Sequence, residues 1–297
     1  MARQDALDLL DQAGSAAKLR EAYLGIQENY QKLSNVARVK ARTVGAVNAG
    51  SFVYPRFKNA TVNTYGTART AGAGVAGVKE EITVNLSVHK EIVEEFEKFD
   101  LETSGLDVIS QRIFNHPQRM MANNDRAFWA AVKTAVAAYD SANSTTHAAN
   151  ITWPNATTPD YLDLIEQLIV KVETTSSNYI DGVTRDLIFV AVRPAIYSKI
   201  QQKLDTIYAY NGNSELIEVP GYHGVMVFSE LYLPSGTDFI AGVIGGAAQP
   251  VRSDGYSSPE RIGLSNSYAI SLFWDYGNGV LAPEAFYEGE FAEAAAA

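Results

Sequence analysis

The hydrophobic pattern is most regular between residues 78 and 136, where it changes from the period of a strand to that of a helix. Apolar residues first alternate with polar ones, which places one face of a β-strand against a core, at Ile82, Val84, Leu86 and Val88. Because apolar spacing resumes at Phe96, the extended segment can reach Phe99. Residues 78–99 would then span roughly 70 Å, more than the diameter of about 50 Å expected for a compact chain of this length. The segment is therefore predicted to bend or to project.

A long helix is predicted to follow this extended segment. Ser104 and Asp107 have the spacing of a helix-capping pair. After them, apolar residues recur at steps of three and four, as on one helix face, at Leu106, Ile109, Ile113, Met120 or Met121, Phe128, Val132 and Val136. Pro117 lies inside this pattern, where its ring would clash with the carbonyl group of Ile113. We therefore expect a kink or a break of the helix at Pro117.

A second extended segment precedes the first one along the chain. Its apolar side chains are Phe52, Val53, Tyr54, Phe57, Ala60 and Val62. Pro55 has no N–H group to donate, which keeps part of this segment away from a central sheet position. Residues 65–77, between the two segments, are rich in Gly, Ala and Thr and have little hydrophobic mass that could anchor them in a core. Two long strands joined by such a flexible tip predict a projecting hairpin.

The N-terminal part of the chain predicts a helix and an arm. Residues 4–34 have the pattern of a helix broken at Gly14, with one narrow apolar stripe formed by Leu19, Tyr23, Ile26, Tyr30 and Leu33. This stripe packs either on its own domain or on a neighbouring subunit. Residues 35–50 are basic, small and weakly patterned, as in an extended arm.

The stretch from about 155 to 255 favours a mixed α/β domain. Pro159 is expected at the first position of one helix, and Pro194 opens another. Strands are predicted at residues 187–192, 224–228 and 239–244. From Pro259 the chain returns to strands, at residues 262–264, 268–274 and 280–283, which we expect to rejoin the sheet that begins at Val78.

Composition and charge narrow the range of functions. The chain has 297 residues, of which 46% are hydrophobic and 20% charged, as in a soluble protein with a sizeable core. Its apolar runs are far shorter than the roughly 20 residues of a membrane helix. It has no Cys and begins without the apolar core of a secretion signal, so synthesis inside a cell is the default expectation. A net charge of −10 weighs against tight binding of nucleic acid, because phosphate contacts need clustered Lys and Arg. It does not exclude a container whose inner surface faces DNA without binding it tightly.

The motifs give little support for catalysis. Residues 72–77 match the G-x-G-x-x-G pattern of a dinucleotide site, but a strand follows them, so a loop tip is the favoured interpretation. None of the four histidines, at positions 89, 116, 147 and 223, has a second ligand at metal-binding spacing. His89 and His116 are interpreted as surface or capping residues. Asp100 and Glu102 could form an acid/base pair, but their position at a strand-to-helix corner favours capping and ion pairing.

The order of these elements resembles that of the major capsid proteins of tailed bacteriophages, of the Hong Kong 97 type. The resemblance covers residues 36–290 and includes the phrases Phe96-Glu-Lys-Phe-Asp-Leu-Glu102 and Leu187-Ile-Phe-Val-Ala-Val-Arg-Pro-Ala-Ile-Tyr197. It implies an α+β fold with an N-terminal helical arm (1–50), an extended E-loop hairpin (51–80), a peripheral domain with a long spine helix (81–150 and 256–291), an α/β axial domain (151–255) and a C-terminal tail (292–297).

The same resemblance implies a structural protein with no catalysis, cofactor or metal. Such a protein self-assembles as hexamers and pentamers into an icosahedral or prolate shell around the double-stranded DNA genome, without sequence-specific binding and without a membrane. It would be a virion component assembled in the host bacterial cytoplasm, with a portal protein and, where present, a decoration protein as partners. The first 35 residues are too short for the scaffolding segment of many relatives, so a separate scaffolding protein, or none, is expected.

Candidate intersubunit contacts lie in the N-terminal stripe, the hairpin, the corner and an axial loop. They are Leu19, Tyr23, Ile26, Tyr30, Leu33, Lys58, Arg69, Gly72, Gly74, Gly77, Asp100, Glu102, Tyr208 and Tyr210. Some relatives crosslink an E-loop Lys to a neighbour's Asn; Lys58 is the lysine of the outgoing strand, and nothing in the sequence shows that it reacts.

Two alternative functions stay open. An encapsulin-like compartment uses the same fold to enclose enzyme cargo. An unrelated soluble α/β enzyme would need polar residues that converge in a cleft, and the sequence does not assemble such a set.

Overall fold

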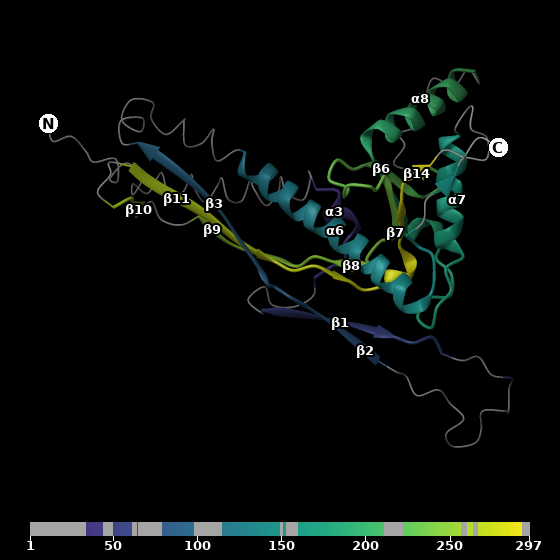
Figure 1. Cartoon of the computed structure of the whole chain (residues 1–297), viewed down its shortest axis with the longest axis horizontal. Coiled ribbons are helices and arrows are strands. Elements are labelled where there is room, and N and C mark those ends of the chain that lie inside the picture. Colours follow the sequence, from purple (N-terminus) through teal and green to yellow (C-terminus); the bar gives the residue numbers. More distant parts are fainter. Residues whose placement is uncertain are drawn as a thin grey trace.

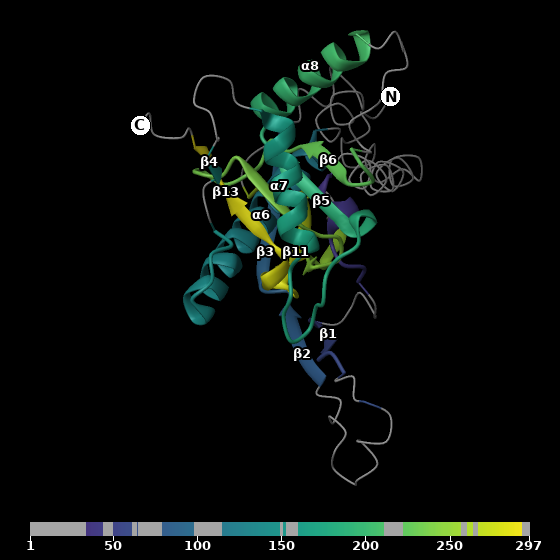
Figure 2. The same cartoon turned by 90° about the vertical axis from the view of Figure 1, so that its right-hand side faces the viewer.

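The computed structural model describes residues 34–43, 50–60, 64, 79–97, 115–148, 151–152, 160–210, 222–256, 260–263 and 267–292. Within these residues an elongated body combines a long sheet, a long helix and a compact α/β end, and a two-stranded hairpin leaves the body at an angle (Figure 1). A view turned by 90° shows the hairpin directed away from the compact end (Figure 2).

The extended stretch that begins at Val78 forms two strands in two different sheets. β2 (Lys79–Asn85) pairs antiparallel with β1 (Ser51–Phe57), and together they form the two-stranded hairpin. β3 (Val88–Glu97) instead pairs antiparallel with β11 (Ser267–Tyr276). The prediction that the stretch bends or projects is therefore confirmed, because the chain changes sheet at Leu86 and Ser87. Pro55 lies in an edge strand, as predicted.

The sheet that contains β3 has one buried and one outer face. β9 (Val251–Tyr256) and β10 (Glu260–Arg261) also pair with β11, so the strands predicted near 262–264 and at 268–274 rejoin this sheet. The strand predicted at 280–283 does not, because Gly279 and Val280 pair with Ala248 and Ala247 in a separate two-stranded sheet. On the buried face, Leu272 and Trp274 pack against Met120 of the long helix. The outer face carries the alternating residues of β3 and β11, including Val93 and Phe273.

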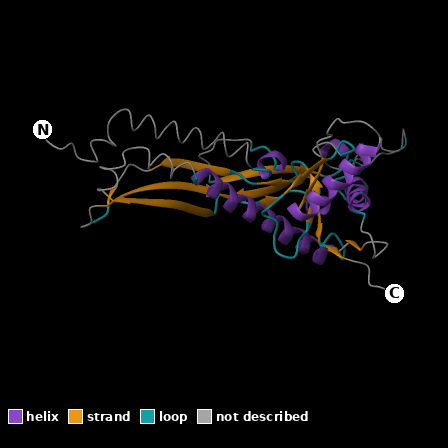
Figure 3. Cartoon of the chain, turned by 90° about the horizontal axis from the view of Figure 1, so that it is seen from above, coloured by secondary structure: helices purple, strands orange, loops and turns teal. Residues whose placement is uncertain are grey.

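The long helix, α6 (His116–Asn143), lies along these strands (Figure 3). The expected kink or break would show between this helix and the residues before Asn115, which lie outside the described residues, so it stays a prediction. Pro117 occupies its first turn, where a missing N–H group costs nothing and the fixed φ angle suits the helix. The predicted cap at Ser104 and the turns before it lie outside the described residues. The helix ends at Asn143. The side chain of Asp140, in its last turn, accepts hydrogen bonds from the backbone N–H groups of His147 and Ala148 in the segment that follows, both at 2.7 Å.

The compact end is a four-stranded sheet between helices. Its order is β13 (Tyr287–Gly289), β7 (Phe239–Val243), β5 (Ile188–Val192) and β6 (Met226–Ser229). β5 pairs parallel with β6 and antiparallel with β7. All five residues of β5 are buried, because Ile188, Val190 and Val192 face α7 (Tyr161–Glu173) and α8 (Pro194–Tyr210) while Phe189 and Ala191 face α6. Cover on both faces explains the unbroken apolar run.

The starts of α7 and α8 test the two proline predictions. α8 begins at Pro194, as predicted. α7 begins at Tyr161, and its N-cap is Asp160, whose side chain accepts hydrogen bonds from the N–H groups of Leu162 and Asp163. The prediction that Pro159 holds the first helical position is therefore wrong, because a side-chain acceptor satisfies the free N–H groups here.

Residues 34–43 pack against the body rather than extending from it. They form a short helix, α3 (Val36–Val39), whose two valines are fully buried beside Phe128 and Trp129. The expectation of an extended arm is therefore wrong for these residues, since two apolar side chains three positions apart are enough to dock one helical turn.

The remaining elements are short. They are β4 (Ile151–Thr152), η1 (Arg185–Leu187), β8 (Ala247–Ala248), β12 (Gly279–Val280), η3 (Pro283–Ala285) and β14 (Phe291–Ala292). β14 pairs parallel with β4, and β12 pairs antiparallel with β8. The proposed domain boundaries remain a prediction.

Candidate functional site

The described residues offer no cluster suited to metal chemistry. No three His, Asp or Glu side chains among them gather as metal ligands, and no helix among them is long and apolar enough to cross a membrane. Each histidine instead faces a carboxylate: His89 meets Asp275 at 2.6 Å, His147 meets Asp140 at 2.7 Å, His116 meets Glu94 at 3.2 Å and His223 meets Glu166 at 3.4 Å.

The sequence predicted surface or capping positions for two of these histidines, His89 and His116. His89 is exposed, as predicted. His116 is 1% exposed and the N-cap of α6 is Asn115, so its interpretation as a surface or capping residue is wrong. The helix turns His116 toward β3, where Glu94 pairs with its ring.

The hairpin has one face on the body and one face outside. Phe52 and Val84 lie opposite each other on the inner face and are buried. On the outer face, Val53 is 50% exposed and Phe57 is 61% exposed. Large apolar side chains on the outside of a projecting element are typical of a surface that contacts another molecule.

The hairpin is attached to the body near the Phe57–Lys79 end of its described ladder. Arg56 of β1 forms an ion pair with Glu284 of η3, and its guanidinium carbon lies 3.8 Å from the ring centroid of Tyr179. The backbone N–H group of Asn59 donates a 2.8 Å hydrogen bond to the carbonyl oxygen of Asn178. Burial lowers the pKa of Arg56, although a guanidinium remains protonated at any physiological pH.

The outer face of the β3–β11 sheet combines apolar and acidic side chains. Val93 is 47% exposed and Phe273 is 41% exposed. Glu91 lies opposite Phe273, and Glu95 lies on the same face two residues beyond Val93. This face is a second exposed surface with apolar content.

Residues 34–40 are held by buried polar groups. The Ser34 hydroxyl donates a 2.8 Å hydrogen bond to Asp125, the Asn35 amide donates to the carbonyl oxygen of Ser229 at 3.0 Å, and Lys40 donates to the carbonyl oxygen of Gln249 at 3.1 Å. Burial raises the pKa of Asp125 to about 7. Burial likewise raises the pKa of Glu230 and lowers that of Lys40, so three buried ionisable groups meet where this segment docks.

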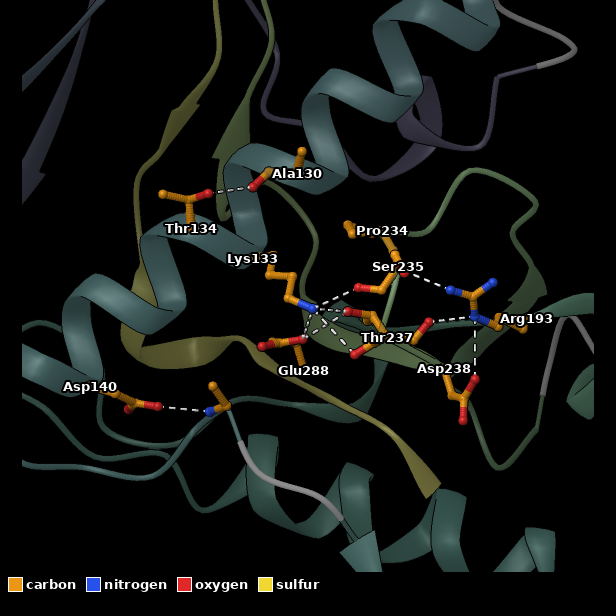
Figure 4. A network of polar contacts seen from close by, with 12 residues as sticks. Ala130, Lys133, Thr134, Asp140, Arg193, Pro234, Ser235, Thr237, Asp238 and Glu288 are labelled. Carbon is orange, nitrogen blue, oxygen red and sulfur yellow. Dashed lines mark hydrogen bonds and ion pairs between the residues drawn. The ribbon is translucent and has the colours of Figure 1, made fainter. Parts of the chain in front are cut away.

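A polar network joins α6 to the sheet of the compact end (Figure 4). Lys133 donates to Thr237 at 2.8 Å and to the carbonyl oxygens of Ser235 and Gly236 at 3.1 and 3.2 Å. Thr237 in turn donates to the buried Glu288 of β13 at 3.0 Å. Arg193 binds the same turn from the other side, through the carbonyl oxygens of Thr237 and Pro234. The long helix and the sheet are therefore rigidly connected.

Most of the predicted contact residues lie outside the described residues. These are Leu19, Tyr23, Ile26, Tyr30, Leu33, Arg69, Gly72, Gly74, Gly77, Asp100 and Glu102. Lys58 is exposed beside the hairpin anchor, with its amine 5.9 Å from the ring centroid of Tyr179. Tyr208 and Tyr210 lie in the last turn of α8. The anchor residues Arg56, Tyr179 and Glu284 were missed; the only signal in the sequence was an arginine on the same face of β1 as Phe52 and Tyr54.

Comparison with known proteins identifies the fold. No protein-family model and no curated protein matches the chain. The capsid of an empty GTA particle matches with a TM-score of 0.61 and 13% identity, over 87% of this chain and 90% of that one. The capsid of the cyanophage P-SCSP1u matches with a TM-score of 0.59 and 16% identity, over 86% of each chain. A virus-like particle from Pyrococcus furiosus matches with a TM-score of 0.55 and 12% identity, over 92% of this chain and 98% of that one.

These matches confirm the predicted resemblance at the level of the fold. The chain has the fold of the capsid proteins of tailed phages, of the Hong Kong 97 type, and the described helices and strands are those of a mixed α and β protein.

Proposed function

We propose that the chain is a major capsid protein, which self-assembles into the shell around the double-stranded DNA genome of a tailed phage. The observation that carries the proposal is the projecting hairpin with exposed Val53 and Phe57 on its outer face. These apolar side chains are exposed in the isolated subunit, and their burial against further copies would stabilise an assembly. The likeness in fold to phage capsids over most of both chains supports the same function.

The parts of the capsid fold are assigned as follows. β1 and β2 belong to the E-loop, α6 is the spine helix, the β3–β11 sheet belongs to the peripheral domain, and the sheet around β5 belongs to the axial domain. The hairpin then overlies an adjacent subunit. The last turn of α8, which contains Tyr208 and Tyr210, is assigned to the capsomer centre, and Lys58 to the boundary that the hairpin crosses.

Weak contacts are sufficient for this function. A closed shell repeats one contact over many copies, so each interface can be modest while the particle is stable. The net charge of −10 suits a wall that does not bind packaged DNA tightly. The function implies a portal protein as a partner and the virion as the final location. A separate scaffolding protein, or assembly without one, is expected.

Removal of the hairpin tip tests the function. Deletion of Thr67–Gly77 is expected to leave the melting temperature of the subunit unchanged and to abolish stable particles. An internal deletion in the Ser235–Thr237 turn serves as the contrasting control, because it removes contacts of Lys133 and should lower the melting temperature. Normal particles from the tip deletion would exclude the proposed role of the hairpin.

Particle contents distinguish the two shell functions. A phage capsid produced with its partner proteins should hold double-stranded DNA and have one portal vertex. An encapsulin-like compartment should hold protein cargo and lack the portal. A virus-like particle from Pyrococcus furiosus also matches this fold, so the fold alone does not separate the two functions.

A further inference from the structure

Glu284 is a buried carboxylate that depends on the hairpin for its charge partner. Its side chain lies in η3 and is 2% exposed. Its oxygen Oε1 forms an ion pair with the guanidinium of Arg56 and accepts a 3.2 Å hydrogen bond from the Ser177 hydroxyl. Oxygen Oε2 is buried without a hydrogen-bond partner among the described residues. Since an unpaired buried charge is strongly unfavourable, Arg56 supplies most of the compensation.

Tyr179 holds both strands of the hairpin at the same point. Its ring stacks on the Arg56 guanidinium of β1 at 3.8 Å, an arrangement that adds a cation–π attraction to the ion pair. Its hydroxyl group donates a hydrogen bond to Glu80 of β2, which raises the pKa of Tyr179. Arg56 and Glu80 lie opposite each other in the hairpin ladder. One aromatic residue of the body therefore contacts a cross-strand pair.

The hairpin has a second attachment at its base. There Val84 of β2 packs with Ala41 and Ala248, and the backbone of Asn85 lies against Gly277. Ser51 pairs with Asn85, and in an extended strand Ser51 and Arg56 are about 17 Å apart. Two attachments separated by this distance fix a direction, whereas one attachment would leave the hairpin free to pivot.

We propose that Arg56, Glu284 and Tyr179 form a latch that presets the angle at which the hairpin leaves the subunit, and that shell assembly requires this angle. The three are positioning residues: they need not touch the neighbouring subunit. Presetting the angle in the free subunit lowers the ordering cost of each contact that the hairpin makes. The requirement for assembly rests on the proposed capsid function, but the latch itself does not.

The variants are chosen so that the subunit still folds. Arg56→Ala alone would leave the buried carboxylate of Glu284 without its charge partner, which would destabilise the subunit for a reason unrelated to the hairpin angle. The double variant Arg56→Ala with Glu284→Gln removes both charges together, which avoids that penalty. The matched control is Lys58→Ala, because Lys58 is a cation on the same side of the chain near the same ring, at 5.9 Å instead of 3.8 Å.

A distance measurement in the unassembled subunit tests the latch directly. The chain has no Cys, so spin labels can be attached to Thr83→Cys on the hairpin and Val170→Cys on α7, both exposed positions. Labelled subunits are diluted with unlabelled ones, and pulsed electron paramagnetic resonance gives the distribution of label distances. We expect the double variant to broaden this distribution about twofold and Lys58→Ala to leave it unchanged. An unchanged distribution in the double variant would overturn the latch.

Particle yield tests the second half of the proposal. In the double variant we expect about tenfold fewer particles than in the parent, at equal subunit melting temperature. The control for yield is Arg126→Ala, because Arg126 also lies beside a tyrosine ring, 5.1 Å from the centroid of Tyr232, but belongs to α6 and not to the hairpin. Parent-level yield with a broadened distance distribution would show that assembly does not require the preset angle. If the parent chain forms no particles at all, the proposed capsid function fails, while the label distances still decide whether the latch exists.

Discussion

Gly277 lies directly against the backbone of Asn85, where the hairpin meets the body. A Cβ atom at position 277 would overlap the carbonyl oxygen of Asn85, and one at Gly279 would overlap the side chain of Val84. Backbone atoms cannot move aside as a flexible side chain can. Two glycines on the returning chain therefore allow β2 to approach the body closely before the chain turns into β3.

Replacing Gly277 tests this close approach. Gly277→Ala is expected to lower the free energy of unfolding of the subunit by roughly 1–3 kcal/mol, as overpacking does. Protection of backbone amides from hydrogen exchange should be lost first at the hairpin base. Denaturant unfolding gives the free energy, and hydrogen exchange at residues 84–86 locates the change. Gly50→Ala is the control, since a Cβ atom at position 50 meets no heavy atom within 4 Å. Equal free energies for the two variants would contradict the account.

The outer face of the hairpin should matter for assembly alone. Val53→Asp with Phe57→Asp changes exposed positions, so the free energy of unfolding of the subunit should stay within about 0.5 kcal/mol of the parent. Sedimentation should show a large loss of particles, because two charges would be buried in each contact. Phe52→Ala, on the inner face of the same strand, should do the opposite and cost about 3–5 kcal/mol of subunit stability. Particles in normal yield from the Asp variant would exclude this face as a contact.

Asp125 predicts a pH dependence of stability. Its pKa in the folded protein is raised to about 7 from a usual value of 3.8, chiefly by burial. The folded state then holds a proton that the unfolded state has released, so this group's contribution is complete below pH 4 and is lost as the pH rises through 7. Between pH 5 and 8, urea unfolding should show a larger fall in the free energy of unfolding for the parent than for Asp125→Asn, by about 2–3 kcal/mol. Parallel curves would mean that Asp125 titrates normally.

Lys133 should be important for the connection between α6 and the sheet. Lys133→Met removes three hydrogen bonds to residues 235–237 and the 3.8 Å ion pair with the buried Glu288. We expect a loss of about 1–3 kcal/mol, measured by thermal unfolding. Arg119→Met, at an exposed position of the same helix, should change stability by less than about 0.5 kcal/mol. A similar effect of both variants would indicate a loss of helix propensity only.

Local patterns predicted the elements well and their partners poorly. The unbroken apolar run of Ile188–Val192 and the helix start at Pro194 depend on neighbouring residues, and both were predicted correctly apart from Leu187, which belongs to η1. The hairpin followed from two extended segments and from Pro55. The pattern did not show that the described helix begins beside Pro117, because helical spacing alone does not mark a helix start and proline is common in a first turn.

The contacts that position the hairpin could not be read from the sequence. Arg56 meets Glu284 and Tyr179 only because three distant segments converge, and no short-range spacing records that convergence. His116 and Asp125 likewise have ordinary surroundings in the sequence and are buried by tertiary packing. The predicted contacts in the N-terminal stripe and the hairpin tip stay predictions.

Electron microscopy of the purified, unmodified protein tests the central claim most directly. If the chain is a capsid protein, negatively stained samples should contain closed, hollow particles of uniform diameter, and the subunit should sediment mainly with them. A preparation that remains monomeric at high concentration, under conditions in which the protein is folded and with turnover on a small-molecule substrate, would contradict the account.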